Sequence, residues 1–195
     1  MSCGCNHQDF CVSAGATWNP VVRWATDVLK SAPITAITNS APVQITATAH
    51  GVTDGWPVAV VGVQGMVQIN ATRYPPAGRD WRRATVVDAN TIAINSDSSA
   101  DWSTYLSGGY LVYSTPVDLA DVEASLTIWD NPEHQGTPLV TLASGSGGIV
   151  IDPTGLTIKP LLQTAGLAWQ TGYYTLAATA GAIVTELMDG VITIE

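Results

Sequence analysis

The amino-acid sequence predicts an all-β protein, and two observations support this expectation. Apolar and polar residues alternate over short stretches, as at Val43, Ile45 and Ala47, and a period of two is typical of half-buried strands. Gly, Pro, Asn and Asp separate such stretches at intervals of roughly ten residues, which is the spacing of a sandwich or barrel. The length of 195 residues allows one large domain or two small ones.

Composition narrows the classes of function. Hydrophobic residues make up 46% of the chain, which is enough for a core, and the formal net charge of −9 argues against a surface that binds nucleic acid or anionic membrane. No apolar run has transmembrane length and no signal peptide is visible, so we expect no membrane insertion and folding in a reducing cytosol. Seven Trp and six Tyr against one Phe favour interfaces, although core and strand positions are the commoner use of each ring.

The first twelve residues hold all three cysteines, in the pattern Cys3-x-Cys5-x-His7-x-x-x-Cys11. Three interpretations stay open for this segment. It is a flexible or partner-bound tail with ordinary thiols, a source of disulfides within or between subunits, or a zinc or iron site with four soft ligands. The close spacing within nine residues leaves little backbone freedom for a metal site, so we expect no cofactor.

The elements follow from the chain in order. Residues 17–22 read as a strand that Pro20 confines to an edge or a bulge, and Pro33 ends this first segment. His50-Gly51, Asp54-Gly55 and the stretch 88–90 are turn sequences, because Gly, Asn and Asp tolerate left-handed backbone. The second half supplies strands at residues 122–129, 138–142, 148–151, 156–158, 172–176 and 183–194. Only residues 160–165 suggest a helical turn.

The region from residue 34 to residue 113 resembles a known family. The resemblance rests on Ala49-His50-Gly51-Val52, Gly62-Val63 with Gly65-Met66, Val87-Asp88-Ala89-Asn90-Thr91, and Tyr105 with Ser107-Gly108-Gly109. These motifs are similar to those of a small β-domain in bacteriophage tail proteins, which is described by its likeness to the first catalytic-cysteine half-domain of ubiquitin-activating enzymes. Because residues 34–113 contain no cysteine, the resemblance implies a β-barrel or sandwich without that enzyme's chemistry.

The remainder of the chain carries a second resemblance. It rests on Ala14-Gly15-Ala16-Thr17-Trp18, Val117-Asp118-Leu119, residues 146–151, the segment from Trp169 to Leu176, and the segment from Glu186 to Ile194. These segments are similar to immunoglobulin-like β-sandwiches of phage tail and baseplate proteins, including the N-terminal part of baseplate upper proteins. The two resemblances together imply a tail at residues 1–12 and an immunoglobulin-like sandwich made of residues 13–32 and 114–195. The β-domain of residues 33–113 is then inserted after the first strand of the sandwich.

Four of the seven basic residues lie in one short segment of the acidic chain. Arg, Tyr and Trp together are typical of protein-interface hot spots. A solvated loop is the alternative, and a nucleic-acid patch fits an acidic chain poorly. The candidate interface residues are Arg73, Tyr74, Arg79, Trp81, Arg82 and Arg83.

Sequence motifs of catalysis are missing. His50 fits a strand-to-turn corner and His134 a polar turn, and neither accompanies a nucleophile in a Gly-x-Ser-x-Gly elbow. Residues 95–101 lack the closing Glu of a calcium loop and read as a turn. The glycines at residues 145–148 precede a strand, whereas a phosphate loop precedes a helix. We therefore expect no enzyme activity.

What the resemblances imply is a structural protein of a tailed-phage virion, in the tail, baseplate or fibre-attachment region. It would be assembled in the host cytoplasm, and its partners would be copies of itself and other virion proteins. Substitution of Trp81 or Arg82 should then weaken assembly without unfolding the chain. One alternative is a capsid decoration or cement protein. The other is a host-surface adhesin that stacks glycan on exposed Trp56, Trp81 or Trp102.

Overall fold

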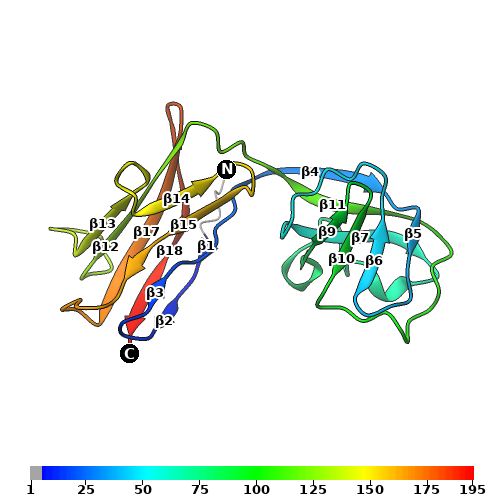
Figure 1. The fold of residues 1–195 in the computed structure, drawn as a ribbon, viewed down its shortest axis with the longest axis horizontal. Helices are drawn as coiled ribbons and strands as arrows, with labels where there is room; N and C mark the ends of the chain where they lie inside the picture. Colours follow the sequence, from blue (N-terminus) through cyan, green and yellow to red (C-terminus); the bar gives the residue numbers. More distant parts are fainter. Residues whose placement is uncertain (1–5) are drawn as a thin grey trace. The chain divides into compact units, whose positions relative to one another are not determined.

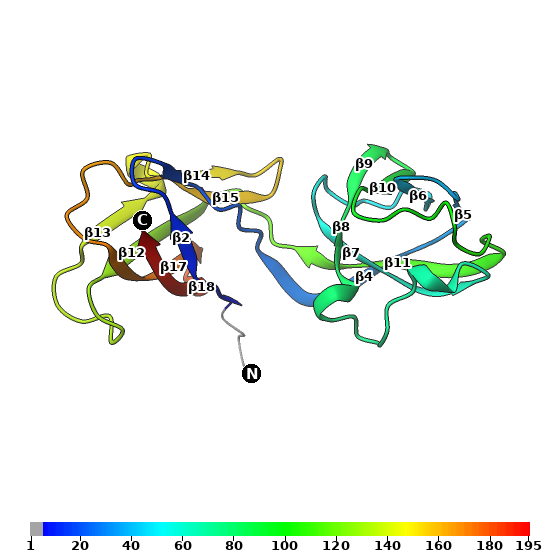
Figure 2. The same cartoon turned by 90° about the horizontal axis from the view of Figure 1, so that it is seen from below.

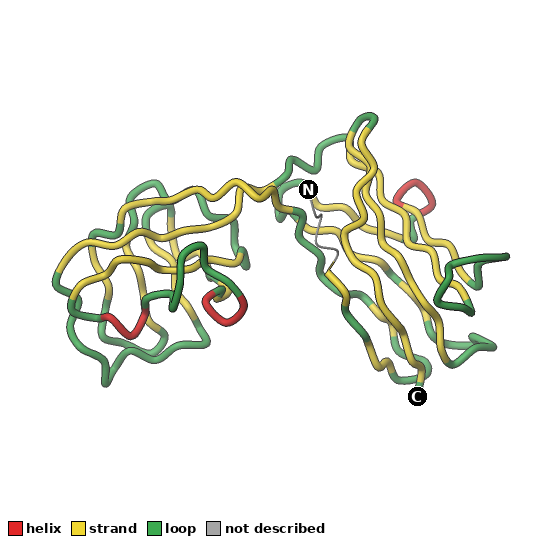
Figure 3. Tube along the Cα trace, turned by 180° about the vertical axis from the view of Figure 1, so that it is seen from behind, coloured by secondary structure: helices red, strands yellow, loops and turns green. Residues whose placement is uncertain are grey.

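The computed structural model describes residues 6–195, and within them the protein is built from β-strands and turns (Figure 3). The only helical elements in this range are three single 3-10 turns: η1 (Val67–Ile69), η2 (Gly78–Asp80) and η3 (Ser144–Ser146). The expected all-β class is confirmed. The chain divides into two compact units, of which unit 1 comprises Met1–Trp24 with Val117–Glu195 and unit 2 comprises Ala25–Pro116.

Unit 1 contains a six-stranded sheet and a second, smaller layer (Figure 1). The sheet order is β1 (Asn6–His7), β18 (Ile183–Ile194), β17 (Thr171–Ala180), β12 (Val122–Trp129) and β13 (Val140–Ala143), with β2 (Phe10–Val12) also paired to β18. Both β1 and β2 run parallel to β18, and the other pairs are antiparallel. The second layer holds the hairpin β14 (Ile149–Asp152) to β15 (Thr157–Pro160) and the pair β3 (Thr17–Trp18) with β16 (Leu162–Gln163).

The two layers of unit 1 share one core, which makes the unit a β-sandwich. Along β12 the burial alternates without interruption, so that Leu126 and Ile128 point inward and the residues between them point outward. Ile149, Ile158 and Leu162 of the second layer belong to the same buried cluster. In the larger sheet β17 lies in the centre, with β18 on one side and β12 on the other.

The N-terminal strands pack closely against β18. A Cβ added at Gly190 would overlap the carbonyl oxygen of Gln8, so only glycine fits there. The buried hydroxyl of Tyr174 donates a hydrogen bond of 2.6 Å to that same oxygen. Beside it, the amide of Val191 donates to the Asp9 carboxylate at 2.9 Å. The segment from β1 to β2 is thereby fixed to the sheet at the point where its two short strands meet.

Unit 2 consists of two four-stranded antiparallel sheets that Figure 2 shows as two layers. One sheet has the order β5 (Ala36–Ile37), β6 (Val43–Thr46), β10 (Thr91–Ile94) and β9 (Thr85–Asp88). The other has the order β4 (Ala25–Pro33), β11 (Ser107–Pro116), β7 (Pro57–Gln64) and β8 (Arg82–Arg83). Both sheets contribute fully buried apolar side chains, among them Ile45, Ile92, Val60 and Leu111.

The chain crosses between the two sheets of unit 2 at two corners. At the first, the amide of Ile34 donates to Gly109 of one sheet at 3.0 Å and the next amide, Thr35, donates to Thr46 of the other at 2.8 Å. At the second, Ala84 donates to Trp56 at 3.0 Å, and the following residue already belongs to β9. Because the edge strands continue into each other, the two sheets are joined at both edges as in a small barrel.

Two expectations from the sequence differ from the structure. Residues 25–32 and 114–116, assigned to the sandwich, belong to β4 and β11, which pair with each other in unit 2. Most side chains of β4 are exposed, so no alternation marks the domain to which this strand belongs. The helical turn expected at residues 160–165 is wrong, because this stretch holds the end of β15 and all of β16. The burial there has a period of two, with Leu162 and Thr164 inside and Gln163 outside.

We predict that Gly190→Ala lowers the stability of the protein to urea by about 1–3 kcal/mol, the usual cost of overpacking. The added methyl group has to displace the backbone at Gln8. Gly145→Ala is the matched control, since a Cβ there meets nothing within 4 Å, and it should change stability by less than about 0.5 kcal/mol. Equal urea midpoints for both variants would contradict the close approach of the N-terminal strand.

Candidate functional site

The surface of unit 2 is hollowed where β8 passes into β9. The hollow has a volume of about 740 Å³ and is open to solvent. Three arginines and one carboxylate are among its walls, which leaves an excess of positive charge. The lining residues are Gly55, Arg79, Trp81, Arg82, Arg83, Ala84, Thr85, Asn95, Ser96 and Asp97. We call this surface the arginine hollow.

Arg82 stabilises the structure around the arginine hollow. Its Nε lies 2.6 Å from Oδ2 of Asp97, and the two side chains are only 18% and 16% exposed. Its Nη1 also donates to the carbonyl of Ile69 at 3.2 Å. A guanidinium that links three segments in this way is structural, so the expectation that Arg82 could be replaced without unfolding is not supported by its contacts.

The other two arginines keep their charge available to solvent. Arg83 is exposed and donates to the carbonyl of Gly55 at 3.2 Å, which holds the side chain without neutralising it. Arg79 is exposed and makes no hydrogen bond or ion pair with any residue from 6 to 195. Trp81 is half-buried and adds an aromatic surface to the same hollow.

One carboxylate holds the loop beside the hollow. Asp80 is 6% exposed and accepts hydrogen bonds from the amide and hydroxyl of Thr72, at 2.9 and 3.0 Å, and from the amide of Ala77 at 3.1 Å. The amide of Thr72 is the main cause that lowers the pKa of Asp80, followed by that of Ala77 and, more weakly, by the nearby charge of Arg73. The loop closed by these bonds carries Arg73 on its surface and Tyr74, which is 69% exposed.

The candidate metal or disulfide residues are only partly within the described structure. Cys3 and Cys5 lie outside the described residues. His7 pairs with Asp189 on β18 at 3.1 Å, and Cys11 is a free, exposed thiol opposite Thr193, four residues farther along the same strand. Between residues 6 and 195, no group of three or more His, Cys, Asp or Glu is placed to hold a metal ion. The zinc or iron site and the disulfides therefore stay predictions.

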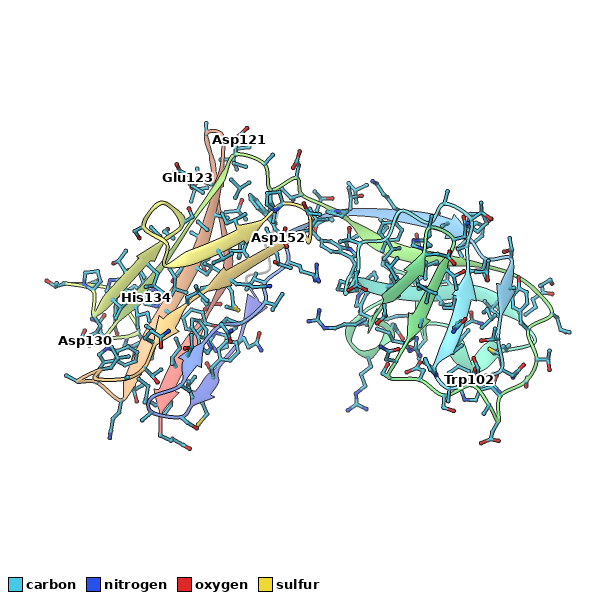
Figure 4. All side chains as sticks on the ribbon, viewed as in Figure 1. Trp102, Asp121, Glu123, Asp130, His134 and Asp152 are labelled. Atoms are coloured by element: carbon cyan, nitrogen blue, oxygen red, sulfur yellow. The ribbon has the colours of Figure 1, made fainter. Side chains whose placement is uncertain are left out.

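The sequence suggested Trp56 as an exposed ring for glycan stacking, but the structure buries it. It is 1% exposed, and its indole Nε1 donates to the carbonyl of Ser114 at 3.0 Å, so it belongs to the core of unit 2. Trp81 and Trp102 are half-buried, and Figure 4 labels Trp102 on unit 2. A glycan site on Trp56 is thus incompatible with the fold.

Both histidines beyond the N-terminal segment serve local structure. His50 is 3% exposed; its Nδ1 accepts the amide of Val52 and its Nε2 donates to the carbonyl of Asp88, both at 3.0 Å. This agrees with the strand-to-turn corner expected from the sequence. His134, labelled in Figure 4, stacks on Trp129 with ring centroids 4.6 Å apart.

Sequence reasoning missed Asp80 and Asp97, the two carboxylates that build the site. The stretch around Asp97 reads as a turn, and nothing in it points to a partner 15 residues earlier in the chain. The sequence around Asp80 contained a weak indication of its role. An acidic residue often accepts a hydrogen bond from the amide three positions earlier, as Asp80 does from Ala77. Such a pattern predicts a closed loop but no function.

No protein-family model matches the chain, and no curated protein matches it either. Residues 6–195 contain no helix with the length and apolar character that a membrane span requires. The function is therefore argued from the geometry and charge of the chain's own surfaces.

We predict that Asp80→Asn loosens the loop at residues 72–80 and lowers the unfolding temperature near neutral pH. The folded-state pKa of Asp80 is lowered, so its stabilisation is complete above the ordinary aspartate pKa of about 3.9 and is lost as the pH falls through the folded-state value. Thermal unfolding followed by circular dichroism should show the difference from wild type shrinking as the pH falls below the ordinary aspartate pKa. A difference that does not change with pH would contradict this role for the ionised carboxylate.

We predict that Arg82→Ala costs about 1–3 kcal/mol of unfolding free energy, because it leaves the Asp97 carboxylate without its charged donor. Arg79→Ala is the matched control and should cost less than about 0.5 kcal/mol. Urea unfolding of both variants measures the two values. If both variants unfold like wild type, the pair between Arg82 and Asp97 contributes nothing to stability.

Proposed function

We propose that this chain is a non-enzymatic structural component of a bacteriophage virion, placed in the tail, baseplate or fibre-attachment region. It acts by assembling with copies of itself and with other virion proteins. The observation that carries the assembly role is the arginine hollow, where Arg79 and Arg83 are charged and exposed beside Trp81. Arg and Trp are enriched at interface hot spots because they combine a large contact area with directional polar groups.

The rigidity of the surroundings of the hollow also supports assembly. The three hydrogen bonds to Asp80 and the pair between Arg82 and Asp97 hold the loop and the floor of the hollow in one arrangement. A surface that is already ordered loses little conformational entropy when it binds, so modest contacts suffice for association. Tyr74, exposed on the same loop, extends the surface with a second aromatic ring.

The placement in a phage virion rests on the resemblance of residues 34–113 to phage tail β-domains and of the remainder to tail and baseplate sandwiches. Two β-units that each bury a core fit such modules. Repetition of the chain by the symmetry of a particle would multiply its contacts.

The test is to identify the proteins of purified phage particles from the source of this chain by mass spectrometry. We expect the chain to be present in particles separated from soluble protein, at a fixed ratio to the other tail proteins. Finding it only in the soluble fraction would overturn the proposal. A soluble host protein released by the same lysis serves as the control for contamination.

A further inference from the structure

The outer face of the six-stranded sheet of unit 1 carries no Lys or Arg from its strands, and the two histidines at this face are already engaged, His7 with Asp189 and His134 with Trp129 and Thr175. The four strands β12, β13, β17 and β18 contain no Lys or Arg. On β12, Glu123 points outward because its neighbours Val122 and Ala124 are buried. On β18, Glu186 lies opposite Ala177, on the same outward side. We call this surface the acidic face.

Glu123 and Glu186 stand on neighbouring rows of the acidic face. The row of Glu123 runs through Thr179 to Val184, and the next row runs from Ser125 to Glu186. From ordinary strand and residue spacings, the Cα atoms of these two residues are roughly 12 Å apart. Neither forms a hydrogen bond or ion pair with any residue from 6 to 195.

Glu123 also borders a small hollow. The chain leaves β13 after Ala143 and turns through η3, and Ser144 Oγ accepts the amide of Ala124 at 3.1 Å. This leaves a hollow of about 240 Å³ whose walls carry one carboxylate and several hydroxyl groups but no cation. Figure 4 shows Glu123 near the end of β12 where the β17–β18 hairpin turns. A guanidinium needs a carboxylate and further acceptors arranged in this way.

Most of the negative charge of the chain belongs to unit 1. Unit 1 has two Lys and Arg against ten Asp and Glu, whereas unit 2 has five against six. Four of the five basic residues of unit 2 belong to the segment from residue 73 to residue 83, next to or within the arginine hollow. The chain therefore carries both an acidic surface and a basic one, each on a different unit.

The charges decide which surfaces can meet when copies of the chain associate. Contact between two arginine hollows, or between two acidic faces, places like charges together and is disfavoured. Contact between the arginine hollow of one copy and the acidic face of another places opposite charges together. Such a contact closes as a twofold dimer when two copies exchange it reciprocally, and it forms rings or rows when each copy uses its two surfaces on different neighbours.

We propose that the arginine hollow of one copy docks on the acidic face of a second copy, with Arg79 entering the hollow beside Glu123. The inference rests on the proposed assembly role and names its partner surface. Arg79 supplies the charge that no residue of its own described chain neutralises, and Arg83 with Trp81 widens the contact.

The test uses reciprocal charge reversals in the full chain. Arg79→Glu places a negative charge in the arginine hollow, and Glu123→Arg places a positive charge on the acidic face. In each case like charges meet in the contact, so each variant alone should self-associate at least about tenfold more weakly than wild type. An equimolar mixture of the two should regain association, because Glu at position 79 meets Arg at position 123 and the remaining surfaces are wild type. Sedimentation velocity over a concentration series measures this, with circular dichroism confirming that both variants fold.

Matched controls carry the same charge changes elsewhere on the same units. Lys30→Glu lies on β4 and Glu133→Arg lies in the connection after β12, and both positions are exposed and outside the two hollows. Both controls should associate like wild type at equal ionic strength. Wild-type association should weaken as salt is raised.

The outcomes separate this inference from the proposed function. Recovery of association in the mixture, with neither variant associating alone, supports the docking of the two surfaces. If both charge-reversed variants self-associate as strongly as wild type, the inference is overturned and the assembly role is left intact. A wild-type chain that is present in particles but monomeric at every concentration also overturns it, because the partner of the arginine hollow is then another protein.

Discussion

The arginine hollow depends on one main-chain contact at Ala84. Ala84 donates a hydrogen bond to the carbonyl of Trp56 and accepts one from the amide of Gly55, and immediately afterwards the chain changes sheets. Because β8 and β9 diverge from this buried point, the surface between them is open, and the side chains before and after the corner border the opening. The pair between Arg82 and Asp97 joins β8 to the segment after β10 in the wall of this opening. The closure of the barrel and the presence of a surface hollow are thus consequences of the same change of direction.

Much of the fold followed from local patterns, and most of the site did not. Alternation located β12 and β18 to the residue, since each lines a core on one side, and the turn at His50 followed from its neighbour Gly51. The strand at Ala25–Pro33 was assigned to the wrong unit because it exposes most of its side chains and leaves no periodic trace. Composition found the arginine cluster, but the separate roles of Arg79 and Arg82 depend on Asp97, whose position is fixed only by the folded barrel. Distant pairs of this kind lie beyond any reading of neighbouring residues.

Buried polar groups show how unit 2 tolerates its long connections. His50 uses both ring nitrogens on main-chain partners, and the hydroxyl of fully buried Ser99 donates to the carbonyls of Thr38 and Ser40. Buried groups without partners would cost free energy, and these partners remove that cost while fixing the loops at the ends of the barrel. The acidic loop at residues 95–101 is therefore held by the hydroxyl of Ser99 and by the ion pair between Arg82 and Asp97.

The parallel pairing of β1 and β2 with β18 determines how unit 1 responds to tension. Pulling residue 6 and Glu195 in opposite directions loads the hydrogen bonds between these strands along the strand axis, so that they resist together in shear. The carbonyl of Val12 receives the amide of Glu195, which extends this set of bonds to the last residue. Force applied between these points passes directly from β2 to β18, so unit 2, whose sequence lies between them, remains unloaded until that pairing breaks.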